Sequence, residues 1–458
     1  MERIQADMLV IGSGAAGQAC AIQAAKLGKQ VIVAEKESFV GGACLNTGTI
    51  PSKSLREAIV ELTRFHDRNF YGQSLTFEDV TFQDLNFRLQ KVLEEERRVL
   101  GRQFRKNGIR LLHGQARFLS PMEVVIEGEI PYHVTADRIF IGTGSKPRQP
   151  VEVPFDGEVI FDSTSLLNIG RIPRTMIVLG GGVIGSEYAS FLSALGTEVT
   201  VVDKRGHMLT HLDEEIGIHL QTQLAALGLR FLGHRRPVKI ERIGDRAHVE
   251  LDDGSHLDAD ALLYSLGREA NVDGLDLPRA GIDLEGRGHL SVDAHFQTQT
   301  AHIYAAGDVV PGPALASTSM EQGRLAALHA FDQETAQFTQ CFPLGIYTIP
   351  EISVVGQTEG ELQANGTNYE VGRAYYYEIA RGHITGSVDG MFKILFDADT
   401  CKLLGVHIIG RSASELIHIG QLAMNFGATL DALVHNVFNY PTFAEGYRIA
   451  ALNGLNKL

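Results

Sequence analysis

The sequence predicts an α/β fold with two Rossmann-like nucleotide-binding domains followed by an α+β C-terminal domain. Three observations lead to this prediction: two similar glycine-rich motifs, a short apolar strand before each, and an acidic residue at the end of the strand that follows each. The chain of 458 residues exceeds what one hydrophobic core supports, and its 44% hydrophobic and 21% charged residues are typical of globular proteins. We therefore expect several folded domains.

The first motif is GSGAAG at residues 12–17. An apolar strand at residues 8–11 precedes it, and a helical pattern and a strand at residues 30–34, ending at Glu35, follow it. The glycines permit a tight turn and the approach of a pyrophosphate to a helix N-terminus, and the acid suits a ribose hydroxyl. The predicted dinucleotide contacts here are Gly12, Gly14, Ala15, Ala16, Gly17, Glu35 and Lys36.

The second motif, GGGVIG at residues 180–185, repeats this arrangement between strands at residues 176–179 and 198–202. The acid follows the middle glycine by 21 residues in both copies, from Gly14 to Glu35 and from Gly182 to Asp203. Two complete copies predict that two dinucleotides bind together, namely FAD and a nicotinamide coenzyme. The predicted contacts of the second site are Gly180, Gly182, Gly185, Asp203, Lys204 and Arg205.

Residues 41–53, GGACLNTGTIPSK, resemble the active-site segment of the pyridine nucleotide-disulfide reductases. Residues 141–148 and 266–271 resemble the crossings between the FAD and NAD domains of that family, and residues 347–458 resemble its dimerisation domain. The resemblance implies an FAD-binding domain at 1–149 and 273–338, an NAD(P)-binding domain at 150–272 and a dimerisation domain at 339–458, in a homodimer or higher homo-oligomer. Further cofactor contacts implied by the resemblance are Gly42, Cys44, Lys53, Gly142, Thr143, Gly144, Gly267, Arg268, Gly307 and Asp308.

Two departures from the family pattern affect its disulfide chemistry. The family has a Cys-x4-Cys pair, whereas this chain has Cys44 and Thr49, and a hydroxyl cannot form a disulfide. The histidine that serves as acid–base partner in the family is replaced by Tyr440, five residues before Glu445. A phenol, with a pKa of about 10, is a poor proton acceptor at neutral pH, whereas imidazole, at about 6.5, is a good one. We therefore expect no disulfide reductase activity.

The chain retains the pair Lys53 and Glu187, which matches the family's ion pair beside the flavin. A cation held there favours reduced flavin. The segment GTIPSK, together with residues 439–456, resembles the soluble pyridine nucleotide transhydrogenases, which implies FAD-dependent, ping-pong hydride transfer between NADPH and NAD⁺. For such a site, Asp203 suits the free ribose of NAD(H), and Lys204 and Arg205 suit the 2′-phosphate of NADP(H), unless these cations are a solvated strand end.

The sequence is also compatible with two alternative functions. One is an NAD(P)H diaphorase or oxidase that passes electrons to a quinone, a metal or oxygen, and no motif of the sequence forbids it. The other is a flavin-binding subunit without activity, which the intact nucleotide motifs and the retained Lys53 and Glu187 disfavour.

Composition excludes other classes of ligand. The formal net charge of −14 argues against nucleic acid and anionic membranes, and no apolar run reaches the roughly 20 residues of a membrane span. The four cysteines form no metal-binding pair, so we expect no metal, and with no secretory leader we expect a cytoplasmic protein. As a lone thiol, Cys44 is either a peroxide sensor or, as we favour, a packed side chain.

Outside these motifs, the sequence predicts a helix over residues 82–106 and a strand that begins at Tyr375.

Overall fold

The computed structural model describes residues 2–63, 82–286, 288–335, 337–339 and 341–458. They form two compact units. The first unit comprises Met1–Ser54, Phe87–Arg148 and Gly267–Thr339, and the second comprises Leu55–Asn86, Gln149–Leu266 and Gln340–Leu458. The predicted α/β class is confirmed, because each unit combines helices with a parallel sheet. The boundaries proposed for three domains stay a prediction.

The first unit is built on a seven-stranded sheet with the order β3-β2-β1-β6-β5-β4, in which β19 pairs with β6. The strands with parallel neighbours are β1 (Glu2–Ile11), β2 (Val31–Glu35), β3 (Arg110–His113), β6 (Tyr132–Ile141) and β19 (Ile303–Ala305). An antiparallel meander joins β4 (Gln115–Ser120), β5 (Glu123–Glu127) and β6, and the short ladders pair β7 (Ser145–Pro147) with β16 (Arg268–Ala270) and β17 (Leu284–Glu285) with β18 (His289–Leu290).

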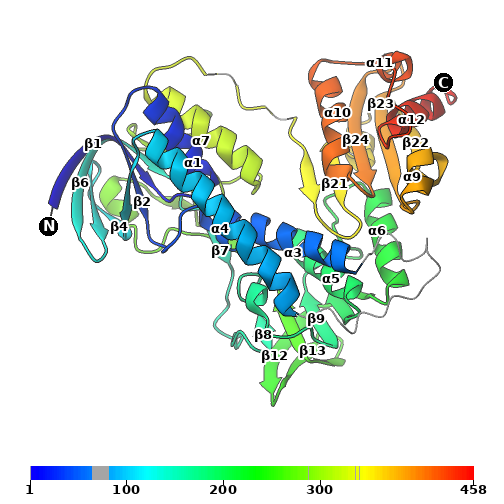
Figure 1. Ribbon diagram of the computed structural model, residues 1–458, viewed down its shortest axis with the longest axis horizontal. Coiled ribbons are helices and arrows are strands. Elements are labelled where there is room, and N and C mark those ends of the chain that lie inside the picture. The colour runs from blue at the N-terminus through cyan, green and yellow to red at the C-terminus, as the bar shows by residue number, and fades with distance from the viewer. Residues whose placement is uncertain (1, 64–81, 287, 336, 340) are drawn as a thin grey trace. The chain divides into compact units, whose positions relative to one another are not determined.

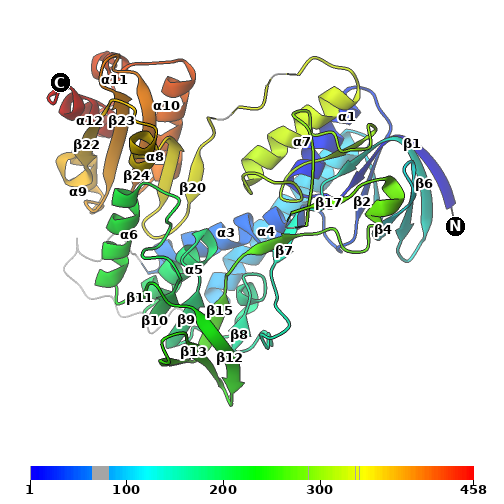
Figure 2. The ribbon, with the colours of Figure 1, turned by 180° about the vertical axis from the view of Figure 1, so that it is seen from behind.

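The central strand β1 is buried on both faces of this sheet. Met8 and Val10 belong to a core that includes helices α1 (Ala15–Lys26) and α7 (Ala316–Ala330), whereas Leu9 and Ile11 belong to a second core. Alternate side chains of a strand point to opposite faces, so a central parallel strand is apolar at successive positions. Helices α1 and α7 pack side by side (Figures 1 and 2). The glycine turn at residues 12–14 thus directly follows the buried C-terminal half of β1.

The nucleotide-binding part of the second unit has a five-stranded parallel sheet in the order β11-β10-β9-β15-β8. Its strands are β8 (Ile160–Phe161), β9 (Thr175–Leu179), β10 (Glu198–Val202), β11 (Arg230–Leu232) and β15 (Ala261–Tyr264). The helices α5 (Val183–Ala194) and α6 (Glu214–Ala226) accompany it, and β12 (Pro237–Ile243), β13 (Arg246–Leu251) and β14 (His256–Ala259) form an antiparallel sheet. The expected strand at residues 198–202 is confirmed by β10.

The C-terminal part of the second unit is an antiparallel five-stranded sheet in the order β20-β21-β24-β23-β22. Its strands are β20 (Leu344–Ile346), β21 (Ile352–Gly356), β22 (Tyr369–Tyr375), β23 (Met391–Asp397) and β24 (Leu403–Ile409). Its helices are α8 (Glu359–Ala364), α9 (Ala380–Ile384), α10 (Ala413–Asn425), α11 (Leu430–His435) and α12 (Glu445–Leu455). Figure 2 shows α6 close to one end of this sheet, in agreement with contacts between α6 and β24.

The prediction of a strand that begins at Tyr375 is wrong, because this residue is the last of β22 and a 3₁₀ turn follows at Tyr376–Glu378. The carboxylate of Glu378 accepts the backbone N–H of Tyr375 at 2.7 Å. The buried hydroxyl of Tyr376 donates to the carbonyl of Arg411 at 3.0 Å. Tertiary packing of one tyrosine ring therefore overrides the strand preference of three consecutive tyrosines.

The remaining helices are α2 (Gly42–Asn46), α3 (Thr49–Leu62) and α4 (Phe82–Lys106). The expected helix over residues 82–106 is confirmed, and its leucines 89, 93 and 100 are buried in the core that contains α1. None of the helices in the described part of the chain is long and apolar enough to cross a membrane.

Two helix glycines allow a test of the packing of α7 on α1. A Cβ added at Gly323 of α7 would lie 2.1 Å from the carbonyl oxygen of Ala16 in α1, whereas one added at Gly360 of α8 would meet nothing within 4 Å. We expect Gly323→Ala to destabilise the protein by about 1–3 kcal/mol through overpacking and to lower its FAD content. The control Gly360→Ala should stabilise by about 0.5–1 kcal/mol, because alanine restricts the unfolded chain. Equal melting temperatures for both variants would contradict the packing of α1 on α7.

Candidate active site

The first glycine turn has the geometry of a phosphate cradle. A Cβ at Gly12 would lie 2.5 Å from the carbonyl oxygen of Gly142, and one at Gly17 would lie 1.9 Å from that of Gly12, so neither position accepts a side chain. Helix α1 begins directly after Gly14, which offers no side-chain cap to its first-turn N–H groups. Such N–H groups, together with the helix dipole, favour an anion.

Glu35 lies beside this turn at the end of β2, with 5% of its surface exposed. One carboxylate oxygen accepts both the backbone N–H and the hydroxyl of Ser13, at 2.9 and 2.5 Å, and the other accepts the N–H of Glu37 at 3.0 Å. The predicted acid is therefore fixed against the glycine turn. The predicted contact Lys36 is exposed, and its ammonium lies 3.9 Å from the carboxylate of Glu37.

The second glycine turn repeats the first in detail. A Cβ at Gly185 would lie 1.9 Å from the carbonyl oxygen of Gly180, the same distance as at the corresponding pair of the first motif. Gly182 precedes α5 with backbone angles of −79° and −174°, close to the −67° and −174° of Gly14 before α1. Asp203, 3% exposed at the end of β10, accepts the N–H of Gly181 at 2.6 Å. Both predicted turns thus form equivalent cradles.

The structure brings Asp203 and Arg205 together as a two-contact ion pair. The guanidinium donates from Nε to Oδ1 at 2.8 Å and from Nη2 to Oδ2 at 2.7 Å, and its Nη1 donates to the hydroxyl of Thr210 at 3.2 Å. Burial raises the pKa of Asp203, but the hydrogen bonds from Arg205 outweigh this effect and lower it. Lys204 is exposed. The sequence predicted these residues as separate ribose and phosphate contacts, and their mutual pairing was not foreseen.

A chain of hydrogen bonds connects the predicted residues Asp308 and Arg268 through Ser145. The hydroxyl of Ser145 donates to Asp308 Oδ2 at 2.8 Å and accepts from Arg268 Nε at 2.8 Å, while Nη2 of Arg268 donates to the Ser145 carbonyl at 2.7 Å. Sequence reasoning missed Ser145, although a hydroxyl directly after the turn at residues 142–144 was a usable signal. The N–H of Gly307 donates to Gln322 at 3.0 Å.

The edge formed by the ends of β1, β6 and β19 fits a flavin dinucleotide. The hydroxyl of Thr143 is buried, and no hydrogen-bond partner for it lies among the described residues. Because an unpaired buried hydroxyl is costly, it suits a polar ligand group. Gly42 packs onto the first turn, since a Cβ there would lie 2.7 Å from the Cα of Gly14. The glycine turn, Glu35 and the unpaired hydroxyl of Thr143 therefore lie within one unit.

Cys44 lies in α2 and is half-buried. Burial raises the pKa of its thiol, the negative charge of Asp308 raises it further, and the ammonium of Lys53 lowers it in part. Thr49, at the position of the missing second thiol, begins α3. A thiol with a raised pKa is protonated at neutral pH and is a weak nucleophile, which favours the packed side chain over the peroxide sensor.

The segment around Cys44 is supported by a residue that the sequence did not single out. Arg97 of α4 stacks its guanidinium over the ring of Phe39 at 3.8 Å and donates to the side-chain oxygen of Asn46 at 2.9 Å. Asn46 in turn donates to the carbonyls of Val40 and Gly42 at 3.1 and 3.0 Å. These contacts hold the N-terminus of α2, where Gly42 lies, in place beside the first glycine turn.

The remaining predicted residues divide between the two units. Lys53 is in the first unit, with its ammonium 3.3 Å from the hydroxyl of Ser52. Glu187 is in the second unit, 3% exposed, and accepts the N–H of Tyr347 at 2.8 Å. The pairing of Lys53 with Glu187 therefore stays a prediction.

Tyr440 and Glu445 lie in the second unit. Tyr440 is 69% exposed. The Oε2 atom of Glu445 is buried, and within the described ranges it has no hydrogen-bond partner. Gly267, which has a φ of 121°, precedes β16 in the first unit, and no atom lies within 4 Å of a Cβ added there.

Comparisons with known proteins agree with these features. Residues 6–323 match the model of the pyridine nucleotide-disulphide oxidoreductases, and residues 342–451 match the dimerisation domain of the same family. The chain belongs to this family. It is therefore an oxidoreductase whose cofactors are FAD and nicotinamide coenzymes, and its dimerisation domain supports a homo-oligomer.

Relatives and solved structures match over nearly the whole chain. A soluble pyridine nucleotide transhydrogenase of Mycobacterium bovis is 47% identical over 99% of this chain and 97% of the relative, and one of Photorhabdus laumondii is 40% identical over 100% of both. The crystal structure of LpdA from Mycobacterium tuberculosis has a TM-score of 0.90 at 25% identity, covering 99% of both chains. The Cu(II) complex of the flavoprotein disulfide reductase RclA from Escherichia coli has a TM-score of 0.89 at 25% identity, covering 98% of this chain and 99% of that one.

Because the pKa of the Cys44 thiol is raised, its rate of alkylation tests whether the thiol is protonated at neutral pH. We expect iodoacetamide to alkylate Cys44 of the holoenzyme at pH 7.5 at least about tenfold more slowly than free cysteine, whose thiol has a pKa of about 8.5. The rate should rise as the pH is raised above 9, because only the thiolate reacts. Mass spectrometry of the labelled peptide measures this rate, and protein unfolded in urea is the control. A midpoint below pH 8 in the folded protein would contradict the protonated thiol.

Proposed function

We propose that this protein transfers hydride between NADPH and NAD⁺ through FAD, without disulfide reductase activity. The observation that carries the proposal is the state of the family's dithiol position, where Cys44 has a raised pKa and Thr49 replaces the second thiol. With no disulfide outlet, a second nicotinamide is the simplest acceptor for the electrons of the flavin. The names of full-length relatives at 47% and 40% identity support the same activity.

FAD, when bound, accepts a hydride from one nicotinamide and gives it to another. The first turn and α1 bind its pyrophosphate, and Glu35 binds its ribose. The second turn, with α5 and Asp203, binds each coenzyme in succession at one site. Transfer from NADPH to NAD⁺ needs no net proton, so replacing the family's histidine by Tyr440 removes nothing that this reaction requires.

Lys53 and Glu187 form the proposed pair beside the flavin, where a cation favours its reduced state. In the proposed homodimer, residues 440–445 of one subunit reach the site of the other, which gives the orphaned carboxylate of Glu445 a place among ligand or partner groups. We place the protein in the cytoplasm, because its four cysteines are free thiols.

A diaphorase that reduces a quinone, a metal or oxygen is the second candidate. The observation that favours it is the likeness to RclA, which was solved as a Cu(II) complex. The two candidates differ in the acceptor of the reduced flavin, so one set of assays separates them.

The deciding assay follows reduction of thionicotinamide adenine dinucleotide by NADPH without oxygen, using the absorbance of the reduced analogue. We expect turnover, ping-pong kinetics, and no oxidation of NADPH by lipoamide or oxidised glutathione. Fast quinone or Cu(II) reduction without transfer to the analogue would establish the diaphorase instead. Measurable reduction of either disulfide would contradict the argument from Thr49.

The pair of Asp203 and Arg205 predicts the coenzyme dependence. Arg205→Met should raise the KM for NADPH about 10- to 100-fold, because a charge-assisted hydrogen bond to the phosphate contributes about 1.5–3 kcal/mol. The KM for NAD⁺ should change far less, since NAD⁺ carries no 2′-phosphate. Arg230→Met, which removes an exposed arginine of β11 with no proposed coenzyme contact, is the matched control and should leave the KM for NADPH unchanged. Equal changes for both coenzymes in Arg205→Met would refute a phosphate contact.

A further inference from the structure

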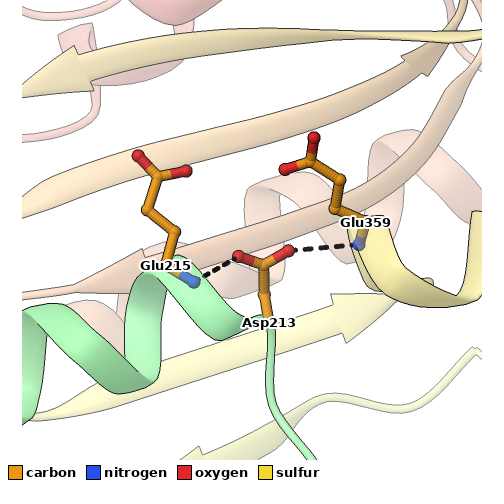
Figure 3. A group of neighbouring side chains, drawn as sticks. All are labelled: Asp213, Glu215 and Glu359. Atoms are coloured by element: carbon orange, nitrogen blue, oxygen red, sulfur yellow. Dashed lines mark hydrogen bonds between the residues drawn. The ribbon is translucent and has the colours of Figure 1, made fainter. Parts of the chain in front are cut away.

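A buried lysine lies at the centre of an acidic cluster in the second unit. Lys393 of β23 is 1% exposed, and its ammonium lies 2.7 Å from Asp213, 2.9 Å from Glu215 and 2.6 Å from Glu359. Figure 3 shows the three carboxylates close together, contributed by α6, by the loop before it and by α8. The carboxylate oxygens lie within 4.8 Å of one another, a spacing that would also suit a metal ion.

The ammonium, rather than a metal, accounts for this cluster. Burial lowers the pKa of Lys393, but hydrogen bonds to the three carboxylates outweigh it and raise the pKa. For Glu215, burial raises the pKa, yet the hydrogen bonds from Arg373 and Lys393 bring it to about 2. Arg373 contacts Glu215 through two hydrogen bonds, each of 2.8 Å. Lys393 and Glu215 are therefore charged at neutral pH and are paired with each other at 2.9 Å.

Asp213 connects this cluster to two helix N-termini. Its Oδ1 accepts the ammonium of Lys393 and the N–H of Glu215 at 3.2 Å, which caps α6, and its Oδ2 accepts the N–H of Glu359 at 3.1 Å at the start of α8. Because α6 belongs to the nucleotide-binding part and β23 and α8 belong to the C-terminal sheet region, the contact fixes one part on the other within this unit.

Asp213 also ends the segment that begins with the ribose acid Asp203. Within this segment, Leu209 has a φ of 53° although its side chain is fully buried. Its N–H donates to the carbonyl of Gly181 in the second glycine turn at 2.8 Å. A bulky residue at positive φ is strained, and such strain persists only where the surroundings hold it. The segment at residues 203–213 is thus fixed at one end by Asp203 and at the other by Asp213, and these contacts maintain the strained backbone at Leu209.

We propose that Lys393 is a positioning residue for the coenzyme site, which holds the segment at residues 203–213 over the second glycine turn by fixing Asp213. The inference rests on the proposed coenzyme site. Loss of the ammonium leaves three buried or half-buried carboxylates without their shared cation, and their repulsion displaces Asp213. The segment then loses its C-terminal anchor, and Leu209 relaxes away from Gly181. The ion pair of Asp213 with Lys393 also connects the segment at residues 203–213 to the part of the chain that matches the dimerisation domain.

The test measures NADPH binding from the concentration dependence of anaerobic flavin reduction in the holoenzyme. In Lys393→Met, we expect the apparent Kd for NADPH and for NADH to rise together about tenfold, which corresponds to about 1.4 kcal/mol. The limiting rate of flavin reduction and the FAD spectrum should stay as in the unmodified protein, because no group at the flavin changes. Lys402→Met, which removes an exposed lysine just before β24, is the matched control and should leave the Kd unchanged.

Asp213→Asn provides a second variant in case Lys393→Met yields no folded holoenzyme. Asparagine still caps α6 but lacks the charge that holds the ammonium, so the Kd should rise in the same direction by a smaller factor. Hydrogen exchange at residues 203–212 should increase in both variants. A lowered melting temperature with unchanged Kd and unchanged exchange in that segment would overturn the proposal and leave Lys393 a purely structural role.

The same measurement separates failure of this inference from failure of the proposed function. Flavin reduction by NADPH is observed whichever molecule later accepts the electrons, so an absence of transhydrogenation does not affect it. Arg205→Met, measured in parallel, raises the Kd for NADPH alone if the coenzyme contacts this segment. An unchanged Kd for NADPH in Arg205→Met would contradict the proposed coenzyme site. A raised Kd in Arg205→Met with an unchanged Kd in Lys393→Met would contradict the positioning role of Lys393.

Discussion

The arrangement of the two nucleotide sites depends on the same kind of hydrogen bond. In each site, a backbone N–H inside the glycine turn donates to the carboxylate at the end of the next strand. Ser13 donates to Glu35 at 2.9 Å, and Gly181 donates to Asp203 at 2.6 Å. Both carboxylates are almost fully buried, and a buried carboxylate is stable only when such donors satisfy it. The bond therefore fixes the turn, the helix N-terminus and the carboxylate relative to one another in each site.

Much of this arrangement could be predicted, because it follows from local rules. The glycine positions and the spacing of 21 residues to each acid fix a strand, a turn, a helix and a strand in order. The strand proposed at Tyr375 failed because a distant contact, from the hydroxyl of Tyr376 to the carbonyl of Arg411, decides the local conformation. Ser145 and Arg97 were missed for a similar reason, since their partners lie far away in sequence.

Lys393 illustrates a signal that was visible but not used. It is the only charged residue among the first six of the strand at residues 391–397, whose other members there are apolar. A lysine at a buried strand position requires carboxylates from elsewhere, because an unpaired buried ammonium is costly. The sequence therefore indicated that partners exist, but Asp213 and Glu359 come from segments that no local pattern connects to this strand. Buried charges in apolar strands predict a tertiary contact without identifying it.

The charge of the chain explains why coenzyme recognition must be local. A net charge of −14 repels anionic dinucleotides at long range, but salt screens this field beyond about 8 Å under physiological conditions. Close to the site, the N-terminus of α5 and the guanidinium of Arg205 supply positive potential. In the proposed coenzyme site, the charge of Arg205 is balanced by that of Asp203, so the pair is nearly neutral toward a ribose without phosphate, while the guanidinium can offer a charge-assisted hydrogen bond to a 2′-phosphate. A balanced acid and base at one strand end thus suits a site that must accept two coenzymes differing by two negative charges.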